Sequence, residues 1–216
     1  MHKALIISGL LTHLSDNIIP FLDDKTDIYC YTWDIEDNSR WIKKLNRYKK
    51  YCRDVFVQVN KPLFHSKRHS YFYSTYKAVN MIKNIFNYDR VIKFKPNLIG
   101  DIKYKGKLEH YFNKASLQSR PLLSETTKEE CLYGSIYYKT MDERMFSGYP
   151  LAFSKIFHIL EDSFVHRMNF LDLDVRKQYG NDCEGSIFWK EWINSYNIKL
   201  IQDIDLIIPD SKPWQQ

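Results

Sequence analysis

Short apolar runs alternate with helix-like stretches over the first hundred residues of the chain. The first run, Lys3–Ser8 (KALIIS), has the uninterrupted apolar pattern of a parallel strand buried on both faces. Three further runs, rich in β-branched and aromatic residues, predict strands at Asp27–Trp33, Asp54–Val59 and Arg90–Phe94. The intervening stretches predict helices at Asn17–Leu22, Arg40–Tyr51 and Tyr71–Phe86. This order indicates βαβ units and a mostly parallel sheet flanked by helices.

The predicted helix Tyr71–Phe86 has one apolar face. Helical spacing brings together five large residues, which we expect in the core: Phe72, Tyr76, Val79, Ile82 and Phe86. The preceding segment, Asn60–Ser70, reads as a polar loop, so we expect its two histidines, His65 and His69, to be exposed.

The second half of the chain mixes strands and helices less regularly. It predicts strands at Leu132–Tyr138 and Lys199–Ile208, and helices at Pro150–Asp162 and Asp182–Tyr196. Glu143–Gly148 is predicted to lead into the first of these helices, and His158 to pack within it. No linker or repeat divides the chain, so the sequence predicts a single α/β domain over residues 1–216.

Composition and charge limit the classes of ligand that the chain is expected to bind. The net charge is +6, with a pI of about 8.9. This suits an anionic small ligand and is less than a dedicated nucleic-acid binder carries. A lysine-rich solvated surface explains the same charge. Aromatic residues make up 16% of the chain, enough to fill a core or to stack on bases and sugars.

Cysteines and targeting signals point to the cytoplasm. The four cysteines, Cys30, Cys52, Cys131 and Cys183, follow no C-x-x-C or zinc spacing, and we interpret them as reduced structural thiols. The apolar start of the chain has no cleavage site and is better explained as a buried strand. No stretch reaches the roughly 20 apolar residues of a membrane span.

Ligands of open α/β sheets bind beyond the carboxyl ends of the strands. Those ends predict a nucleotide site at Ser8-Gly9, at Trp33-Asp34 and at the segment Lys93–Asn97. Gly9 allows close approach to a ligand, or serves as a turn glycine. Trp33 suits base stacking and Asp34 a ribose hydroxyl, with a core tryptophan beside a loop acid as the alternative. Neither G-x-G-x-x-G nor a P-loop motif occurs.

Lys93 and Lys95 share one side of their predicted strand. Two cations at that position suit a diphosphate. Because burying both ammonium groups is costly, we expect them at the open end of the strand.

Several short motifs resemble GT-A-type glycosyltransferases of surface-polysaccharide synthesis and the capsid glycosyltransferases of large DNA viruses. They are ALIISG at residues 4–9, DIYCYTWD at 27–34, a helix with Tyr73, Tyr76, Lys77 and Ala78, and YDRVIKFKPN at 88–97. Later motifs are Asp142 followed by Phe146-Ser147-Gly148, and Glu184 followed by Ile187-Phe188-Trp189. The resemblance covers nearly the whole chain in order.

The resemblance implies a hexosyltransferase-like GT-A (Rossmann-like) enzyme that uses a nucleotide-sugar donor, often a UDP-sugar, with Mn²⁺ or Mg²⁺. It implies a nucleotide-binding half over residues 1–105, an acceptor-side half over 106–208 and a tail at 209–216. It places Ser8, Gly9, Thr12, Trp33 and Asp34 around the nucleoside. The acceptor is a glycan or glycoprotein, and no nucleic-acid partner is expected.

The same resemblance raises a question about the metal. Such enzymes commonly read Arg-x-Arg-Pro-Asp at the fourth strand end, whereas this chain reads Lys-Phe-Lys-Pro-Asn. Asn97 offers an uncharged ligand, and Asp101 lies four residues further on as a substitute carboxylate. Two Asp-x-Asp triplets, Asp172-Leu173-Asp174 and Asp203-Ile204-Asp205, come late in the chain, and we interpret them as solvated loop acids.

An inverting transfer needs a carboxylate to accept the proton of the acceptor hydroxyl. The candidates are Asp142 and Glu184, with a turn acid and a helix N-terminal charge as their structural alternatives. Two other functions stay open: a module that binds nucleic acid or an acidic polymer, and another α/β transferase such as a methyltransferase or nucleotidyltransferase.

Overall fold

The structure of the chain is a computed structural model. It describes residues 1–11, 14, 16–34, 38–61, 64, 67–94, 131–137, 140–180 and 185–202. Within these ranges some side chains, among them those of Lys67, Phe94 and Asp142, are outside the description.

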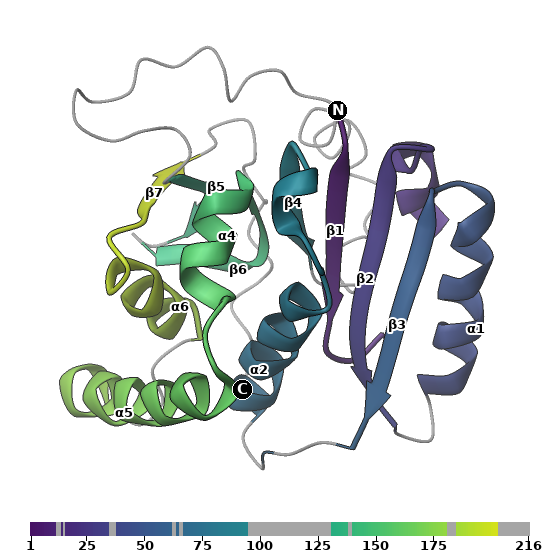
Figure 1. Cartoon of the computed structure of the whole chain (residues 1–216). Helices are drawn as coiled ribbons and strands as arrows, with labels where there is room; N and C mark the ends of the chain where they lie inside the picture. Colours follow the sequence, from purple (N-terminus) through teal and green to yellow (C-terminus); the bar gives the residue numbers. More distant parts are fainter. Residues whose placement is uncertain are drawn as a thin grey trace.

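The described strands form one seven-stranded sheet in the order β3-β2-β1-β4-β6-β5-β7 (Figure 1). Their bounds are β1 Lys3–Ser8, β2 Thr26–Trp33, β3 Asp54–Asn60, β4 Arg90–Phe94, β5 Cys131–Tyr137, β6 Thr140–Gly148 and β7 Lys199–Gln202. Strands β1 to β4 are mutually parallel, whereas β6 runs antiparallel to both β4 and β5. The mostly parallel α/β sheet predicted from the sequence is confirmed.

The parallel half of the sheet is buried on both faces. Every residue of β1 and β2 is buried, because helices cover the sheet on each side. The strand bounds predicted for Lys3–Ser8 and Arg90–Phe94 match the structure residue for residue. Strands β1, β2 and β3 run downward in Figure 1, so their carboxyl ends lie at the lower edge of the sheet.

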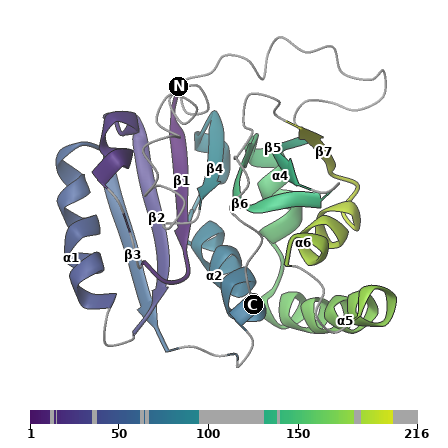
Figure 2. The same ribbon diagram turned by 180° about the vertical axis from the view of Figure 1, so that it is seen from behind.

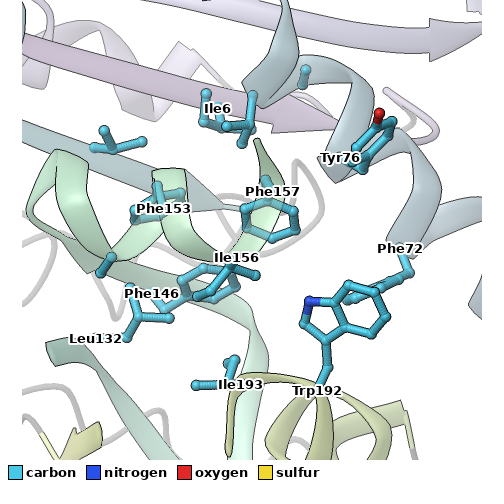
Figure 3. Packing of buried hydrophobic residues seen from close by; sticks show 14 of the residues in the cluster. Ile6, Phe72, Tyr76, Leu132, Phe146, Phe153, Ile156, Phe157, Trp192 and Ile193 are labelled. Atoms are coloured by element: carbon cyan, nitrogen blue, oxygen red, sulfur yellow. The ribbon is translucent and has the colours of Figure 1, made fainter. Parts of the chain in front are cut away.

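Two hydrophobic clusters occupy the two faces. The larger packs β1, β2, β4, β5 and β6 against α2 and against the helices α4, α5 and α6 (Figure 3). The smaller packs the opposite face of β1 and β2 against α1 and the 3₁₀ helix Asp16–Phe21. The helices are α1 Ser39–Arg47, α2 Lys67–Asn80, α4 Pro150–Phe157, α5 Glu161–Tyr179 and α6 Gly185–Asn194. None of the helices in the described ranges combines the length and apolar character of a membrane span.

Helix α2 differs from its predicted bounds at both ends. It begins four residues earlier than predicted, at Lys67, and it ends at Asn80. His69 therefore lies on a helix, with a mostly buried side chain, and its predicted exposure in a loop was wrong. Phe72, Tyr76, Val79 and Ile82 are buried as predicted. Phe86 is 62% exposed, because it belongs to the separate 3₁₀ turn Ile85–Asn87.

The second half of the chain contains two corrections. Residues 140–148 form strand β6, so the predicted lead into a helix at Glu143–Gly148 was wrong. The predicted helix Pro150–Asp162 is broken at residues 158–160 and continues as α5, a 19-residue helix that the sequence analysis did not predict. Tyr76 and Asn80 of α2 donate hydrogen bonds to the carbonyl oxygens of Ile159 and Phe157 at this break. The Phe157 carbonyl is one of those that the end of α4 leaves without a partner in the helix.

Candidate functional site

The candidate site lies where β1 and β2 end. The backbone amide of Gly9 donates to the carbonyl oxygen of Tyr31 (3.0 Å), which continues the β1–β2 pairing past Ser8. Trp33, the last residue of β2, is 7% exposed, and Asp34 directly after it is exposed. The structure therefore brings three of the predicted nucleoside-binding positions, Gly9, Trp33 and Asp34, to one edge of the sheet.

Gly9 is required at this edge by its backbone and by its surroundings. Its φ is +84°, a conformation that side-chain-bearing residues rarely adopt. A Cβ atom there would lie 2.9 Å from Cδ2 of Tyr71 and 3.5 Å from Cη2 of Trp33. Two aromatic rings of the protein therefore lie against Gly9, and the approach of a ligand at this position stays a prediction.

Tyr71, on the first half of α2, links the ends of two strands. Its ring lies against Gly9 after β1, and its hydroxyl oxygen is 2.5 Å from Nζ of Lys93 on β4. From its sequence position Tyr71 is predicted at a helix start, with no role in the site. No motif marks it, since its importance comes from contacts with residues far away in the chain.

Lys93 lies one residue before the end of β4, as predicted, but it is fully buried, so its predicted exposure there was wrong. Its ammonium lies over three aromatic rings, those of Tyr71 (4.3 Å), Phe146 (5.4 Å) and Trp189 (5.4 Å). These distances are within the range of cation–π attraction, which offsets part of the desolvation of the charge. Lys95, its predicted partner in diphosphate binding, lies outside the described residues.

Ser8 is also buried and serves to attach β1 to α2. Its hydroxyl shares a 2.8 Å hydrogen bond with the hydroxyl of Thr75, which also donates to the carbonyl oxygen of Tyr71. This contact holds Tyr71 and the end of β1 in register. The Ser8 hydroxyl therefore points into the protein and fixes the end of β1 to α2.

Asn38 stabilises the end of β2 from the other side and was also missed in the sequence. Its amide nitrogen donates to the Trp33 carbonyl oxygen (2.7 Å) and to Oγ1 of Thr32 (2.5 Å). Its side-chain oxygen accepts from the backbone amide of Leu11 (3.2 Å). The segments that follow β1 and β2 are thereby joined beside Asp34.

Most of the other predicted site residues lie outside the part of the chain that the structure describes. Thr12, Asn97, Asp101 and Glu184 lie outside the described residues, as does the Asp203-Ile204-Asp205 triplet. Asp142 lies in strand β6, so its alternative reading as a turn acid was wrong, and its side chain is not described. Because Met145 pairs with Phe94 in antiparallel register, the Asp142 backbone lies beyond the carboxyl end of β4.

The Asp172-Leu173-Asp174 triplet lies in the interior of α5, so its reading as a solvated loop was wrong. Asp172 is buried, 2.7 Å from Nε of Arg176 and 3.3 Å from Nε2 of His69, while Asp174 is exposed. The two carboxylates therefore face different surroundings and do not form a cation-binding pair. Throughout the described ranges, no group of three or more His, Cys, Asp or Glu side chains has an arrangement suited to a metal ion.

Comparison with known proteins shows similarity in structure alone. No protein-family model matches the chain, and no curated protein matches it in sequence. The solved glycosyltransferase GlyE of Streptococcus pneumoniae TIGR4 is similar over 94% of this chain, with a TM-score of 0.52 and 8% identity. Mouse xyloside xylosyltransferase 1 matches over 91% of the chain and 81% of its own, with a TM-score of 0.35 and 9% identity.

The chain spans less than half the length of GlyE, since the match covers 45% of that protein. At this identity the likeness concerns the path of the backbone. The parallel β3-β2-β1-β4 core, the antiparallel β6 beside it and the helices on both faces make up a GT-A, Rossmann-like α/β fold, as the sequence predicted.

Proposed function

We propose that the chain is a glycosyltransferase that transfers a sugar from a nucleotide-sugar donor, of which UDP-sugars are the first candidates, to a glycan or glycoprotein acceptor. The observation that carries the proposal is the joint ending of β1 and β2 at Gly9, Trp33 and Asp34 in a GT-A fold. In open α/β sheets this edge is where nucleotides bind. The exposed carboxylate of Asp34 can accept a hydrogen bond from a ribose hydroxyl. The aromatic rings of Tyr71 and Trp33, which lie beside Gly9, offer an apolar surface to the nucleoside.

In the proposed transfer, an acceptor hydroxyl attacks the anomeric carbon of the donor sugar. The bond from that carbon to the phosphate oxygen breaks, the glycosidic bond forms, and the nucleoside diphosphate leaves. For an inverting enzyme, Asp142 or Glu184 would accept the hydroxyl proton. Asp142 is supported by its position in β6, past the carboxyl end of β4, on the same edge as Asp34.

The buried position of Lys93 changes the proposed phosphate contacts. With its ammonium held by Tyr71 inside the protein, Lys95 becomes the stronger candidate for direct contact with the donor diphosphate. Mn²⁺ or Mg²⁺, proposed at Asn97 and Asp101, would supply positive charge to the leaving diphosphate when bound.

Thermal unfolding with added nucleotides tests the proposal. A ligand that binds only the folded chain must raise its Tm. We expect a rise with UDP or a UDP-sugar that exceeds the rise with GDP or TDP, measured with and without Mn²⁺. The absence of a shift with all nucleotides and nucleotide sugars would contradict the donor site, and a shift independent of Mn²⁺ would contradict the metal.

A pair of matched variants locates the donor. Asp34→Ala should abolish the nucleotide-dependent rise in Tm. Asp24→Ala removes an equally exposed carboxylate from the turn before β2, at the opposite edge of the sheet, and should keep the rise. Equal responses of the two variants would rule out Asp34 as a donor contact.

A further inference from the structure

The positive charge of the chain is concentrated in one short segment. Residues 39–53 contain seven Lys and Arg residues and no Asp or Glu, whereas the whole chain has a net charge of +6. The rest of the chain therefore carries a net charge of −1. The basic character of the protein is a property of this segment.

Helix α1 arranges these charges on one face. Arg40, Lys43, Lys44 and Arg47 follow the i, i+3, i+4, i+7 spacing of a single helix side. Leu45, on the opposite side, is buried in the cluster against the sheet. Beyond the helix the series continues with Lys49, Lys50 and Arg53. We call these seven residues the α1 ridge.

The basic residues of the α1 ridge are not explained by a contribution to the stability of helix α1. The first turn contains no acidic residue and holds Arg40, although the helix dipole disfavours cations at this end. Like charges three and four residues apart, such as Lys43 and Arg47, also destabilise a helix. Among the described residues, ion pairs involve two members of the ridge, Lys44 with Asp16 (3.2 Å) and Lys49 with Asp54 (3.4 Å). Lys43, Arg47 and Lys50 are exposed and available to a partner.

The shape of the ridge favours a linear anionic chain. Four of its cations lie along one helix, and Arg40 and Arg47 are separated by roughly 10 Å of helix axis. Asp16 and Asp54 are both substantially exposed and lie beside the α1 ridge. Their negative charges limit the width of the positively charged surface. A bilayer surface would require a broad cationic face or free apolar side chains, and the apolar side of α1 is packed on the sheet.

The aromatic residues of the segment favour a glycan over a single-stranded nucleic acid. Base binding relies on exposed rings that stack on the bases. Tyr48 is buried, the guanidinium of Arg40 covers the half-buried Trp41 ring at 4.7 Å, and Tyr51 is exposed. One exposed ring does not give the succession of stacking surfaces that a single-stranded nucleic acid uses, so charge is the main feature of this surface.

The ridge begins at the candidate donor site. Asn38, directly before α1, is hydrogen-bonded to the carbonyl of Trp33, and Arg40 follows two residues later. Figures 1 and 2 show α1 along the outer side of the sheet beside β3, on the opposite side from α5 and α6. A chain bound along α1 would present one end to the edge at Asp34.

We infer that the α1 ridge binds an acidic polysaccharide, the charged part of a glycan acceptor whose end lies at the donor site. The role as acceptor rests on the proposed function, whereas binding of the acidic chain does not.

Fluorescence anisotropy with labelled polygalacturonate oligomers, a carboxylate-bearing glycan, tests the inference on the full chain over a range of salt concentrations. The ridge variant carries Lys43→Gln, Arg47→Gln and Lys50→Gln. The matched control carries Lys25→Gln, Lys83→Gln and Lys177→Gln, which remove the same charge from exposed positions elsewhere. We expect the ridge variant to lose about tenfold or more in affinity and its salt dependence to become shallower by about two in log–log slope. The control should stay within about twofold.

Three results would overturn the inference. Equal losses in the two variants, or no loss in either, would show that the binding is not located on α1. Equal binding of uncharged dextran would exclude recognition of charge. Tighter binding of a single-stranded oligonucleotide, or of vesicles containing anionic lipid, would replace the glycan with that partner.

Nucleotide binding separates this inference from the proposed function. The ridge variant should show the same UDP-dependent rise in Tm as the unmodified chain. If polygalacturonate binds through the ridge but no nucleotide raises the Tm, the donor site and the acceptor role both fail and the polyanion surface stands. If nucleotides bind and the ridge variant keeps full affinity for polygalacturonate, the ridge fails alone.

Discussion

The ammonium nitrogen of Lys93 lies 2.5 Å from the phenolic oxygen of Tyr71, and the Tyr71 ring closes the space beside Gly9. A buried charge on β4 is thus connected through the Tyr71 side chain to Gly9, the residue that follows β1. The Ser8–Thr75 hydrogen bond fixes the same helix to the same strand one turn later. The edge at which we propose donor binding is held in place by polar contacts beneath it.

The Lys93–Tyr71 pair should be asymmetric in its effect on stability. Tyr71→Phe removes a hydrogen-bond acceptor from a buried ammonium and should cost about 1–3 kcal/mol. Lys93→Met keeps the apolar volume and removes the charge, so its cost should stay within about 1 kcal/mol. Urea unfolding measures both, with Lys83→Met as an exposed control. A larger loss in Lys93→Met than in Tyr71→Phe would contradict this interpretation.

Gly9→Ala should damage the site through both strain and collision. The positive φ alone costs roughly 1–2 kcal/mol, and the new Cβ must displace the Tyr71 ring. Gly180→Ala is the matched control, since Gly180 has a φ of +88° and a Cβ added there would meet no atom within 4 Å. Both variants should unfold at lower urea concentration, but the nucleotide-dependent rise in Tm should disappear in Gly9→Ala alone. Its loss in both would indicate a general effect of stability.

The contact between α2 and α5 predicts a pH dependence. Hydrogen bonds from Tyr73 and then from Lys77 to the Glu161 carboxylate hold its pKa below the ordinary value of 4.5. A depressed carboxyl pKa contributes stability that is present above the unfolded pKa and is lost as pH falls through the folded pKa. We therefore expect a measurable coupling between Tyr73→Phe and Glu161→Gln in a double-mutant cycle at pH 7. The coupling should decrease as the pH is lowered from 7 to below the ordinary carboxyl pKa of 4.5, and a coupling that stays constant over this range would contradict the assignment.

Two cysteines should resist modification in the folded chain. Burial raises the pKa of Cys30 far above its ordinary value, and burial with the nearby Asp27 and Asp54 raises the pKa of Cys52 to about 11. Thiolate is the reactive form, so little of either is available at pH 8. In a variant with Cys131→Ser and Cys183→Ser, an aromatic disulfide reagent should label no thiol in the native state and both after unfolding. Rapid native labelling would show that one of the strands opens readily.

Much of the parallel half of the fold was predictable because its signals are local. KALIIS and RVIKF are short, apolar and bounded by residues that end strands, so β1 and β4 were predicted with their observed bounds. Helix α5 was not predicted because its apolar and polar residues do not follow the pattern of an amphipathic helix with apolar residues buried and polar residues exposed. Phe170 and Leu173 on this helix are more than half exposed, while Asp172, which lies between them in the sequence, is buried beside Arg176 and His69.

The sequence by itself determined the order of strands and helices and the positions of Gly9, Trp33 and Asp34 at strand ends. Both follow from the spacing of apolar residues and from where each run stops. Only the tertiary structure decided that Lys93 is buried, since Phe146 and Trp189, which cover its ammonium, lie more than fifty residues further along the chain. The burial of a side chain depends on which distant elements pack over it, and one-dimensional periodicity contains no record of them.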